Sequence, residues 1–304
     1  MSEIHGVVPP IVTPFDAQEE IDLGLLRAEV RHLIDNVGVH GIAAGGSTGE
    51  GHTLTTEELR QVVAATVETA DGRVPVIAGI IVDSTREAIA KGRALADLDV
   101  AALQITPVHY LFKPTDEMMY RHFATIADAL GRPVIIYNVV PWSYCSAELL
   151  ARIITQVYGV IGMQQSAGDL KRLADLMLAL GGRGLVMSAV DALLYPSFCL
   201  GAHGTIAAIV TAVPELSVRL WDAVQAGDHE TALDMHVKML RVWNAIAQDN
   251  LPANVKTALE LQGRPAGLPR SPMPPSSPEQ RQAIRKALAM AGLIDVQSVE
   301  LPAQ

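Results

Sequence analysis

Short aliphatic runs alternate with longer segments of helical periodicity along most of this chain. The first run, Gly6–Val12, precedes a segment at Asp22–Asn36 whose apolar residues fall on one helical face. Seven further runs each precede a helical segment: Gly41–Ala44, Val74–Ile80, Ala101–Ile105, Pro133–Asn138, Ile161–Gln165, Gly184–Ser188 and Gly204–Ile209. Eight βα units with right-handed crossovers are the number that closes a parallel sheet into a barrel. The sequence therefore predicts an α/β fold of the TIM (β/α)8 barrel type.

The pattern changes after residue 226, where helical segments at His229–Ala247 and Pro252–Leu261 follow each other directly. Six of the 18 prolines then fall in residues 263–278, which excludes a helix and predicts an extended connector over the surface. Ser277 is an N-cap signal for a last helix at Pro278–Ala291. We therefore expect a barrel over residues 1–226 and a C-terminal helical region over residues 227–304.

Composition limits the partners that this chain can have. Its 304 residues include 23 Lys and Arg against 33 Asp and Glu, a net charge of −10, with no basic cluster, which argues against nucleic acid or a membrane surface as the partner. No apolar run reaches the roughly 18 residues of a membrane span, and the N-terminus lacks the features of a signal peptide. Cys145 and Cys199 are too few for a disulfide framework. A cytoplasmic protein with reduced thiols is expected.

Polar residues follow three of the predicted strands, at the barrel end where active sites lie. The loop Gly45–Glu50 contains Ser47 and Thr48, whose hydroxyl and backbone N–H groups can hold a carboxylate, although such a loop can also be a simple turn. Tyr137 ends the fifth strand and is either a proton carrier or a core tyrosine. Gln164 and Gln165 end the sixth, where buried amides need a ligand or a polar network as partner.

These motifs, in their order along the chain, resemble the dihydrodipicolinate synthase / N-acetylneuraminate lyase family. The resemblance spans residues 6–214 and rests on several segments: Thr13-Pro14-Phe15, Gly46-Ser47-Thr48-Gly49-Glu50 with Thr53-Leu54-Thr55, Val74–Gly79, Ser84-Thr85, Phe112-Lys113-Pro114, Tyr137-Asn138-Val139, Gly168-Asp169 and Gly201–Gly204. It implies a homotetrameric barrel that acts on pyruvate or a related 2-oxo acid, making or breaking a C–C bond or eliminating water.

The resemblance also assigns roles to individual residues. Ser47 and Thr48 match the pair that binds the 2-oxo acid carboxylate, and Tyr137 matches the tyrosine that moves protons. The backbone carbonyl of Ile206 matches a ligand contact, and Glu50 matches a residue that braces its loop rather than one that reacts. No metal or other cofactor is implied, and the nine histidines show no metal-binding spacing. His52 and His109, in loops expected at the barrel mouth, are candidate acids or bases.

One position departs from the family in a way that affects the mechanism. The sixth strand of the family ordinarily ends in a lysine that forms a Schiff base with the 2-oxo group, whereas the matching residue here is Gln164. A carboxamide nitrogen is not nucleophilic, so Gln164 cannot form an imine. The six lysines of the chain are expected in helices, in loops or in the C-terminal region: Lys91, Lys113, Lys171, Lys238, Lys256 and Lys286.

Two further loops differ from dihydrodipicolinate synthases. Leu111 stands at the position of a relay tyrosine, with Tyr110 beside it, and the stretch 137–145 lacks the arginine that binds the second substrate. Lysine biosynthesis is therefore not expected. Trp142 and Tyr144 predict either an aromatic wall to the site or packing between the barrel and the C-terminal region.

Three functional hypotheses follow. The first is a lyase that polarises the keto group of a 2-oxo acid by hydrogen bonds from Gln164 and Tyr137. The second is a binding or sensor protein that has kept the pocket and lost turnover. The third is an ordinary Schiff-base lyase in which the lysine was changed to Gln164.

Overall fold

The computed structural model describes residues 3–295 and contains a single parallel sheet of eight strands. The strands are β1 Gly6–Val7, β2 Ile42–Ala44, β3 Val76–Ile80, β4 Ala102–Ile105, β5 Val134–Asn138, β6 Val160–Gln165, β7 Leu185–Ser188 and β8 Gly204–Thr205. Each is paired with its neighbour in the order β1-β8-β7-β6-β5-β4-β3-β2. A parallel bridge between Pro10 and Ala43 joins the two ends of this sheet. The expected TIM barrel is confirmed.

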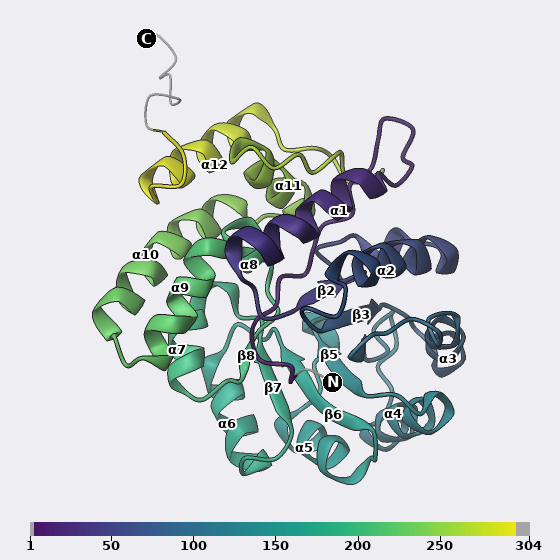
Figure 1. Ribbon diagram of the computed structural model, residues 1–304. Coiled ribbons are helices and arrows are strands. Elements are labelled where there is room, and N and C mark those ends of the chain that lie inside the picture. The colour runs from purple at the N-terminus through teal and green to yellow at the C-terminus, as the bar shows by residue number, and fades with distance from the viewer. Residues whose placement is uncertain (1–2, 296–304) are drawn as a thin grey trace.

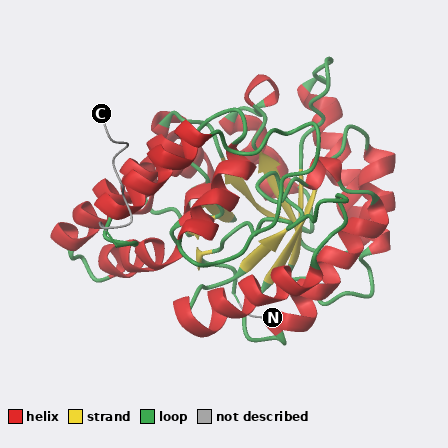
Figure 2. Ribbon diagram, turned by 90° about the horizontal axis from the view of Figure 1, so that it is seen from above, coloured by secondary structure: helices red, strands yellow, loops and turns green. Residues whose placement is uncertain are grey.

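Most of the helices surround the strands, and the C-terminal ones lie to one side, as Figure 1 and Figure 2 show. The helices are α1 Leu23–His32, α2 Thr56–Ala70, α3 Thr85–Ala94, α4 Asp116–Leu130, α5 Ala147–Gln156, α6 Leu170–Leu180, α7 Leu194–Cys199, α8 Ala208–Ala212, α9 Pro214–Gln225, α10 His229–Ile246, α11 Leu251–Leu261 and α12 Pro278–Met290. Among residues 3–295, no helix combines the length and the apolar character that a membrane span requires.

Side-chain caps fix where several helices begin. Thr55 and Glu58 exchange both bonds of a capping box at the start of α2, and Ser277 and Gln280 do the same for α12. The sequence predicts the same capping box for Ser84 and Glu87 at the start of α3. There the structure shows the bond from the Glu87 N–H to the Ser84 side chain, at 3.1 Å.

The first and last strands are shorter than the aliphatic runs that predict them. β1 ends at Val7, and the chain continues through Pro9 and Pro10, which have no N–H to give to a ladder. Backbone bonds nevertheless continue across this gap, because the Ala43 N–H donates to Pro9 and the Ile11 N–H donates to Ala43. The run 204–209 is also not one strand, since β8 ends at Thr205 and α8 begins at Ala208.

The barrel interior is filled at one end and open at the other. Small and medium apolar side chains from several strands pack inside it: Ile4, Val8, Ala43, Ile77, Ala102, Ile135, Met187 and Ile206. A separate apolar layer lies between the strands and the surrounding helices. Polar side chains remain at the carboxyl ends of the strands, where a TIM barrel carries its active site.

The C-terminal helices share an apolar core with α8 and α9, on the side of the barrel where Figure 1 places α10, α11 and α12. The connector after α11 is not helical, as predicted, but its first half is anchored rather than lying free on the surface. Arg264 is buried and pairs with Glu29 at 2.8 Å, and Leu268 bridges to Phe15. The domain boundary at residue 226 stays a prediction, and residues 296–304 lie outside the described part.

Candidate active site

A small cavity lies where the strands end, and all five residues predicted for the site line it. Ser47 and Thr48 reach it from the loop after β2, Tyr137 from β5, Gln164 from β6 and Ile206 from the segment after β8. The remaining lining residues are Pro10, Val139, Ser166, Ala189, Asp191, Ala207, Ala208, Leu251 and Pro252. Its volume is about 160 Å³, below the range of drug-sized sites, so it suits a molecule of few non-hydrogen atoms.

Tyr137 is joined to Ser47 by two hydrogen bonds. Its hydroxyl accepts the Ser47 backbone N–H at 3.1 Å and donates to the Ser47 side-chain oxygen at 3.0 Å. Burial raises the pKa of Tyr137, although the bonds from Ser47 oppose this. The phenol is therefore protonated near neutral pH and can give a proton, or a hydrogen bond, to a ligand in the cavity.

Gln164 is held at both ends of its amide. Its oxygen accepts a hydrogen bond from the Gln104 amide at 2.7 Å, and its nitrogen donates to the Ile206 carbonyl at 2.6 Å. Within residues 3–295, that carbonyl is the one acceptor recorded for the Gln164 nitrogen, which carries two N–H groups. One N–H therefore remains for a ligand in the cavity.

Gln165 faces away from the cavity, because successive side chains of a strand point to opposite sides. Its oxygen accepts from the Asn138 amide at 3.1 Å, and the Asn138 oxygen accepts the Cys145 backbone N–H at 2.9 Å. Of the two adjacent amides seen in the sequence, Gln165 thus belongs to a structural network, and Gln164 belongs to the cavity.

Asp191 lines the cavity and was not identified from the sequence. It follows β7, and its side chain accepts the Ile209 N–H at 2.8 Å, which holds the first turn of α8. Burial raises the pKa of Asp191 to about 7, against the bonds from backbone N–H groups, which lower it. A lone acidic residue after an aliphatic run has no motif, and its place three residues after the seventh strand is the one signal that the sequence offers.

No lysine is found among the residues that line the cavity. Lys256, from α11, is buried and pairs with Glu50 at 2.6 Å. Lys113 lies in the loop after β4 and donates to the Tyr144 backbone carbonyl at 2.9 Å. Lys171 pairs with Asp175 at the exposed start of α6. In the described chain, these three amines are thus engaged away from the residues that line the cavity.

Several residues singled out in the sequence lie elsewhere. The His109 ring is 3.4 Å from Asp83 and 3.1 Å from the Pro107 carbonyl, outside the cavity. Tyr110 is 68% exposed, and Trp142 is 69% exposed with its N–H bonded to the His109 carbonyl at 2.7 Å. Neither Trp142 nor Tyr144 lines the cavity, so the prediction of an aromatic wall is wrong. The exposure of Trp142 also excludes the alternative that it packs against the C-terminal region.

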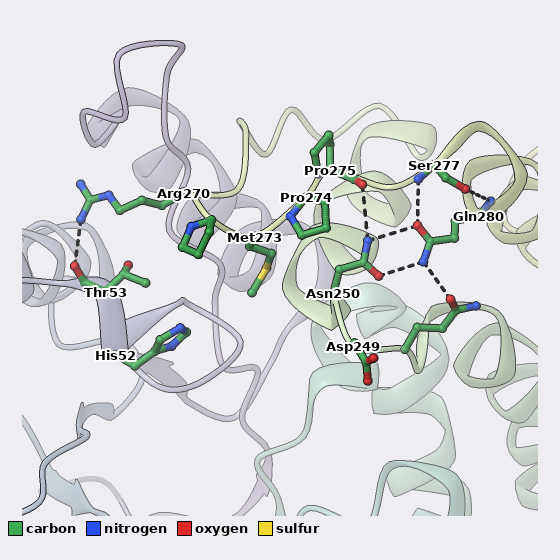
Figure 3. A pocket seen from close by; sticks show the side chains of 12 residues that line it. His52, Thr53, Asp249, Asn250, Arg270, Met273, Pro274, Pro275, Ser277 and Gln280 are labelled. Atoms are coloured by element: carbon green, nitrogen blue, oxygen red, sulfur yellow. Dashed lines mark hydrogen bonds between the residues drawn. The ribbon is translucent and has the colours of Figure 1, made fainter. Parts of the chain in front are cut away.

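His52 lines a second, larger pocket of about 780 Å³ between the loop after β2 and the C-terminal region. Figure 3 shows its polar wall, in which the Asn250 and Gln280 amides bond to each other and to neighbouring groups. Asn250 lines this pocket, and the next two residues, Leu251 and Pro252, line the small cavity. One segment at the start of α11 thus borders both spaces.

Comparison with known proteins identifies the family of this chain. The sequence profile described as "Dihydrodipicolinate synthetase family" matches residues 3–291. The chain belongs to the dihydrodipicolinate synthetase family.

Relatives from distant organisms agree with this placement. The chain is 33% identical to the 4-hydroxy-tetrahydrodipicolinate synthase of Methanopyrus kandleri over 295 residues, covering 96% of this chain and 98% of that protein. It is 36% identical to the synthase of Trichlorobacter lovleyi over 288 residues, covering 92% and 97%. The dihydrodipicolinate synthase of Acinetobacter baumannii, solved as a pyruvate complex, has a TM-score of 0.91 at 32% identity and covers 96% of this chain and 100% of that one.

In this member of the dihydrodipicolinate synthetase family, the C-terminal region braces the loop that carries Ser47 and Thr48. Glu50 has a left-handed backbone (φ 55°) and is fully buried. Its carboxylate accepts from the Lys256 amine at 2.6 Å and from the Arg270 backbone N–H at 2.9 Å. These contacts place Glu50 behind the loop, and it does not line the cavity. Among residues 3–295, no group of three or more metal-ligating side chains gathers at one point.

Proposed function

We propose that this protein is a lyase that binds pyruvate or a similar 2-oxo acid in the small cavity and acts on it without a Schiff base. The observation that carries the proposal is the cavity lining, which brings together Ser47, Thr48, Tyr137 and Gln164 and includes no lysine. The family relatives and the pyruvate complex of the Acinetobacter baumannii synthase support the substrate class.

In this proposal each polar wall of the cavity has a task. Ser47 and Thr48 bind the substrate carboxylate, and the neighbouring keto oxygen faces Tyr137 and Gln164. The Tyr137 hydroxyl turns its single O–H from Ser47 to that oxygen, and the free Gln164 N–H also donates to it as negative charge develops. Such donors contribute about 3–4 kcal/mol each to transition-state stability, which is less than a covalent electron sink provides. The reactions that suit this site are therefore hydration, elimination, or aldol cleavage and condensation of an activated substrate.

The Gln164 position can be tested by restoring an amine. Borohydride treatment in the presence of pyruvate should leave the wild-type chain unmodified, because an amide forms no imine. The Gln164→Lys variant should gain a reduced pyruvate adduct, which mass spectrometry of the intact protein detects. Gln165→Lys is the matched control and should gain none, because that side chain faces away from the cavity. A trapped adduct on the wild-type protein would contradict the imine-free mechanism.

A binding protein without turnover is the second candidate. One observation favours it: both ends of the Gln164 amide are already engaged, by Gln104 and Ile206, as in a purely structural network. Calorimetry with a panel of 2-oxo acids, together with an assay for their consumption, separates the two functions. Binding without consumption across the panel supports the sensor, and consumption supports the lyase.

We further propose that the chain assembles as a homotetramer, as its family resemblance implies. Its cytoplasmic location stays a prediction from the sequence.

A further inference from the structure

The cavity contains two titratable side chains, Tyr137 and Asp191, among the described residues that line it. They come from β5 and from the turn after β7, and the negative charge on Asp191 raises the pKa of Tyr137. The other polar side chains in the lining are hydroxyls and one amide, which do not exchange protons near neutral pH: Ser47, Thr48, Gln164 and Ser166. Any acid–base chemistry in this space must therefore use Tyr137 or Asp191.

The two groups differ in the protonation states that they can take near pH 7. Tyr137 donates its proton to the Ser47 oxygen and, because of burial, has a raised pKa, so it is an acid at pH 7. The same burial brings the pKa of Asp191 to about 7, so its carboxylate form is well populated at that pH. A group that stays protonated near pH 7, beside one that can lose its proton there, has the chemistry of an acid and base pair.

We propose that Asp191 is a catalytic residue that removes a proton from the carbon next to the keto group of the bound 2-oxo acid. The C–H electron pair becomes the C=C bond of an enolate, and the keto oxygen takes the negative charge. That oxygen is held by the Tyr137 hydroxyl and the free Gln164 N–H, while the proton resides on the Asp191 carboxylate. Return of this proton to the carbon regenerates the keto acid, so the step balances without any further reactant. This assignment rests on the proposed function.

The test uses pyruvate and needs no knowledge of the second substrate. In D₂O, wild-type protein should exchange the methyl protons of pyruvate for deuterium, and proton NMR follows the loss of the methyl signal above the uncatalysed rate. Asp191→Asn keeps an oxygen for the Ile209 N–H and cannot take the proton, so exchange should fall by about 100-fold or more. The wild-type rate should rise with pH through about 7, and this rise should be absent in the variant.

A matched control makes the same chemical change at a site outside the cavity. Asp169 is exposed, follows β6 and also accepts a backbone N–H at a helix start, from Lys171 at 2.9 Å. Asp169→Asn should leave exchange and pyruvate affinity unchanged. Calorimetry should also show that Asp191→Asn binds pyruvate as wild type does, within about threefold.

Three outcomes would overturn the role of Asp191, and they can be told apart. If Asp191→Asn exchanges at the wild-type rate, Asp191 only stabilises the first turn of α8, and the proposed function stands. If wild-type protein binds pyruvate without exchanging its protons, the base is refuted, and the site is a binding site. If wild-type protein does not bind pyruvate, the proposed function itself fails.

Discussion

Gln164 carries two hydrogen bonds whose loss would leave buried groups without partners. Gln104 is 2% exposed and gives its amide to the Gln164 oxygen, so replacing Gln104 alone leaves that oxygen unsatisfied. An unsatisfied buried group costs about 1–3 kcal/mol. We therefore expect Gln104→Met and Gln164→Met to destabilise the fold separately, and the double variant to cost about 1–2 kcal/mol less than their sum. Urea unfolding of the four proteins measures this coupling, and strictly additive costs would contradict the contact.

The same residue that is proposed as the base should reduce stability at high pH. The pKa of Asp191 is raised to about 7 from an ordinary value of 3.8, so the carboxyl favours the folded state while it is protonated. This contribution is lost as the pH rises from about 4 through 7. Asp191→Asn has no charge to bury and should gain melting temperature relative to wild type between pH 5 and pH 8. A constant difference across this range would show that the raised pKa is wrong.

At the scale of elements, the aliphatic runs predicted all eight strands, because parallel strands buried on both faces are continuously apolar. The pattern overestimated the lengths of β1 and β8. Hydrophobicity does not indicate that Pro9 lacks an N–H for the ladder, nor that a helix begins at Ala208. The motifs predicted Ser47, Tyr137 and Gln164 as site residues, and all three line one cavity. Their roles there stay predictions. The sequence did not identify Asp191 as a site residue, because its role depends on burial in the cavity, and a single acidic residue in a sequence does not indicate burial.

The buried ion pair between α11 and the loop after β2 gives a prediction about how these elements depend on each other. Lys256 is 2% exposed and Glu50 is 0% exposed, with 2.6 Å between amine and carboxylate. Burial lowers the pKa of Lys256, and the Glu50 charge opposes this. Lys256→Met leaves Glu50 buried without that partner, which should cost about 3–5 kcal/mol of unfolding free energy.

An exposed pair supplies the control for this prediction. Lys238 and Asp234 lie 2.7 Å apart on α10, and Lys238→Met should change stability by less than about 0.5 kcal/mol. Because the loop with Glu50 also carries Ser47 and Thr48, Lys256→Met should weaken pyruvate binding at temperatures where it remains folded. Equal stability of the two variants in chemical denaturation would show that the buried pair does not brace the loop.

At the scale of the whole molecule, apolar side chains gather on two adjoining loops at the barrel mouth. Tyr110, Leu111 and Phe112 are 68–81% exposed on the loop after β4, and Trp142 is 69% exposed on the loop after β5. The loops are tied together by the Trp142 N–H on the His109 carbonyl. Apolar patches of this kind typically mark contacts between chains, which is consistent with the proposed homotetramer.

We therefore expect light scattering to give a mass of four chains for the wild-type protein and a smaller assembly for a Leu111→Ser, Phe112→Ser double variant. Removing these side chains takes apolar area from an interface without touching the barrel core, so circular dichroism should be unchanged. Tyr158→Ser is the control, because Tyr158 is fully exposed but isolated from this patch, between α5 and β6. A wild-type mass of one chain would contradict the assembly, and a tetrameric double variant would place its interface elsewhere.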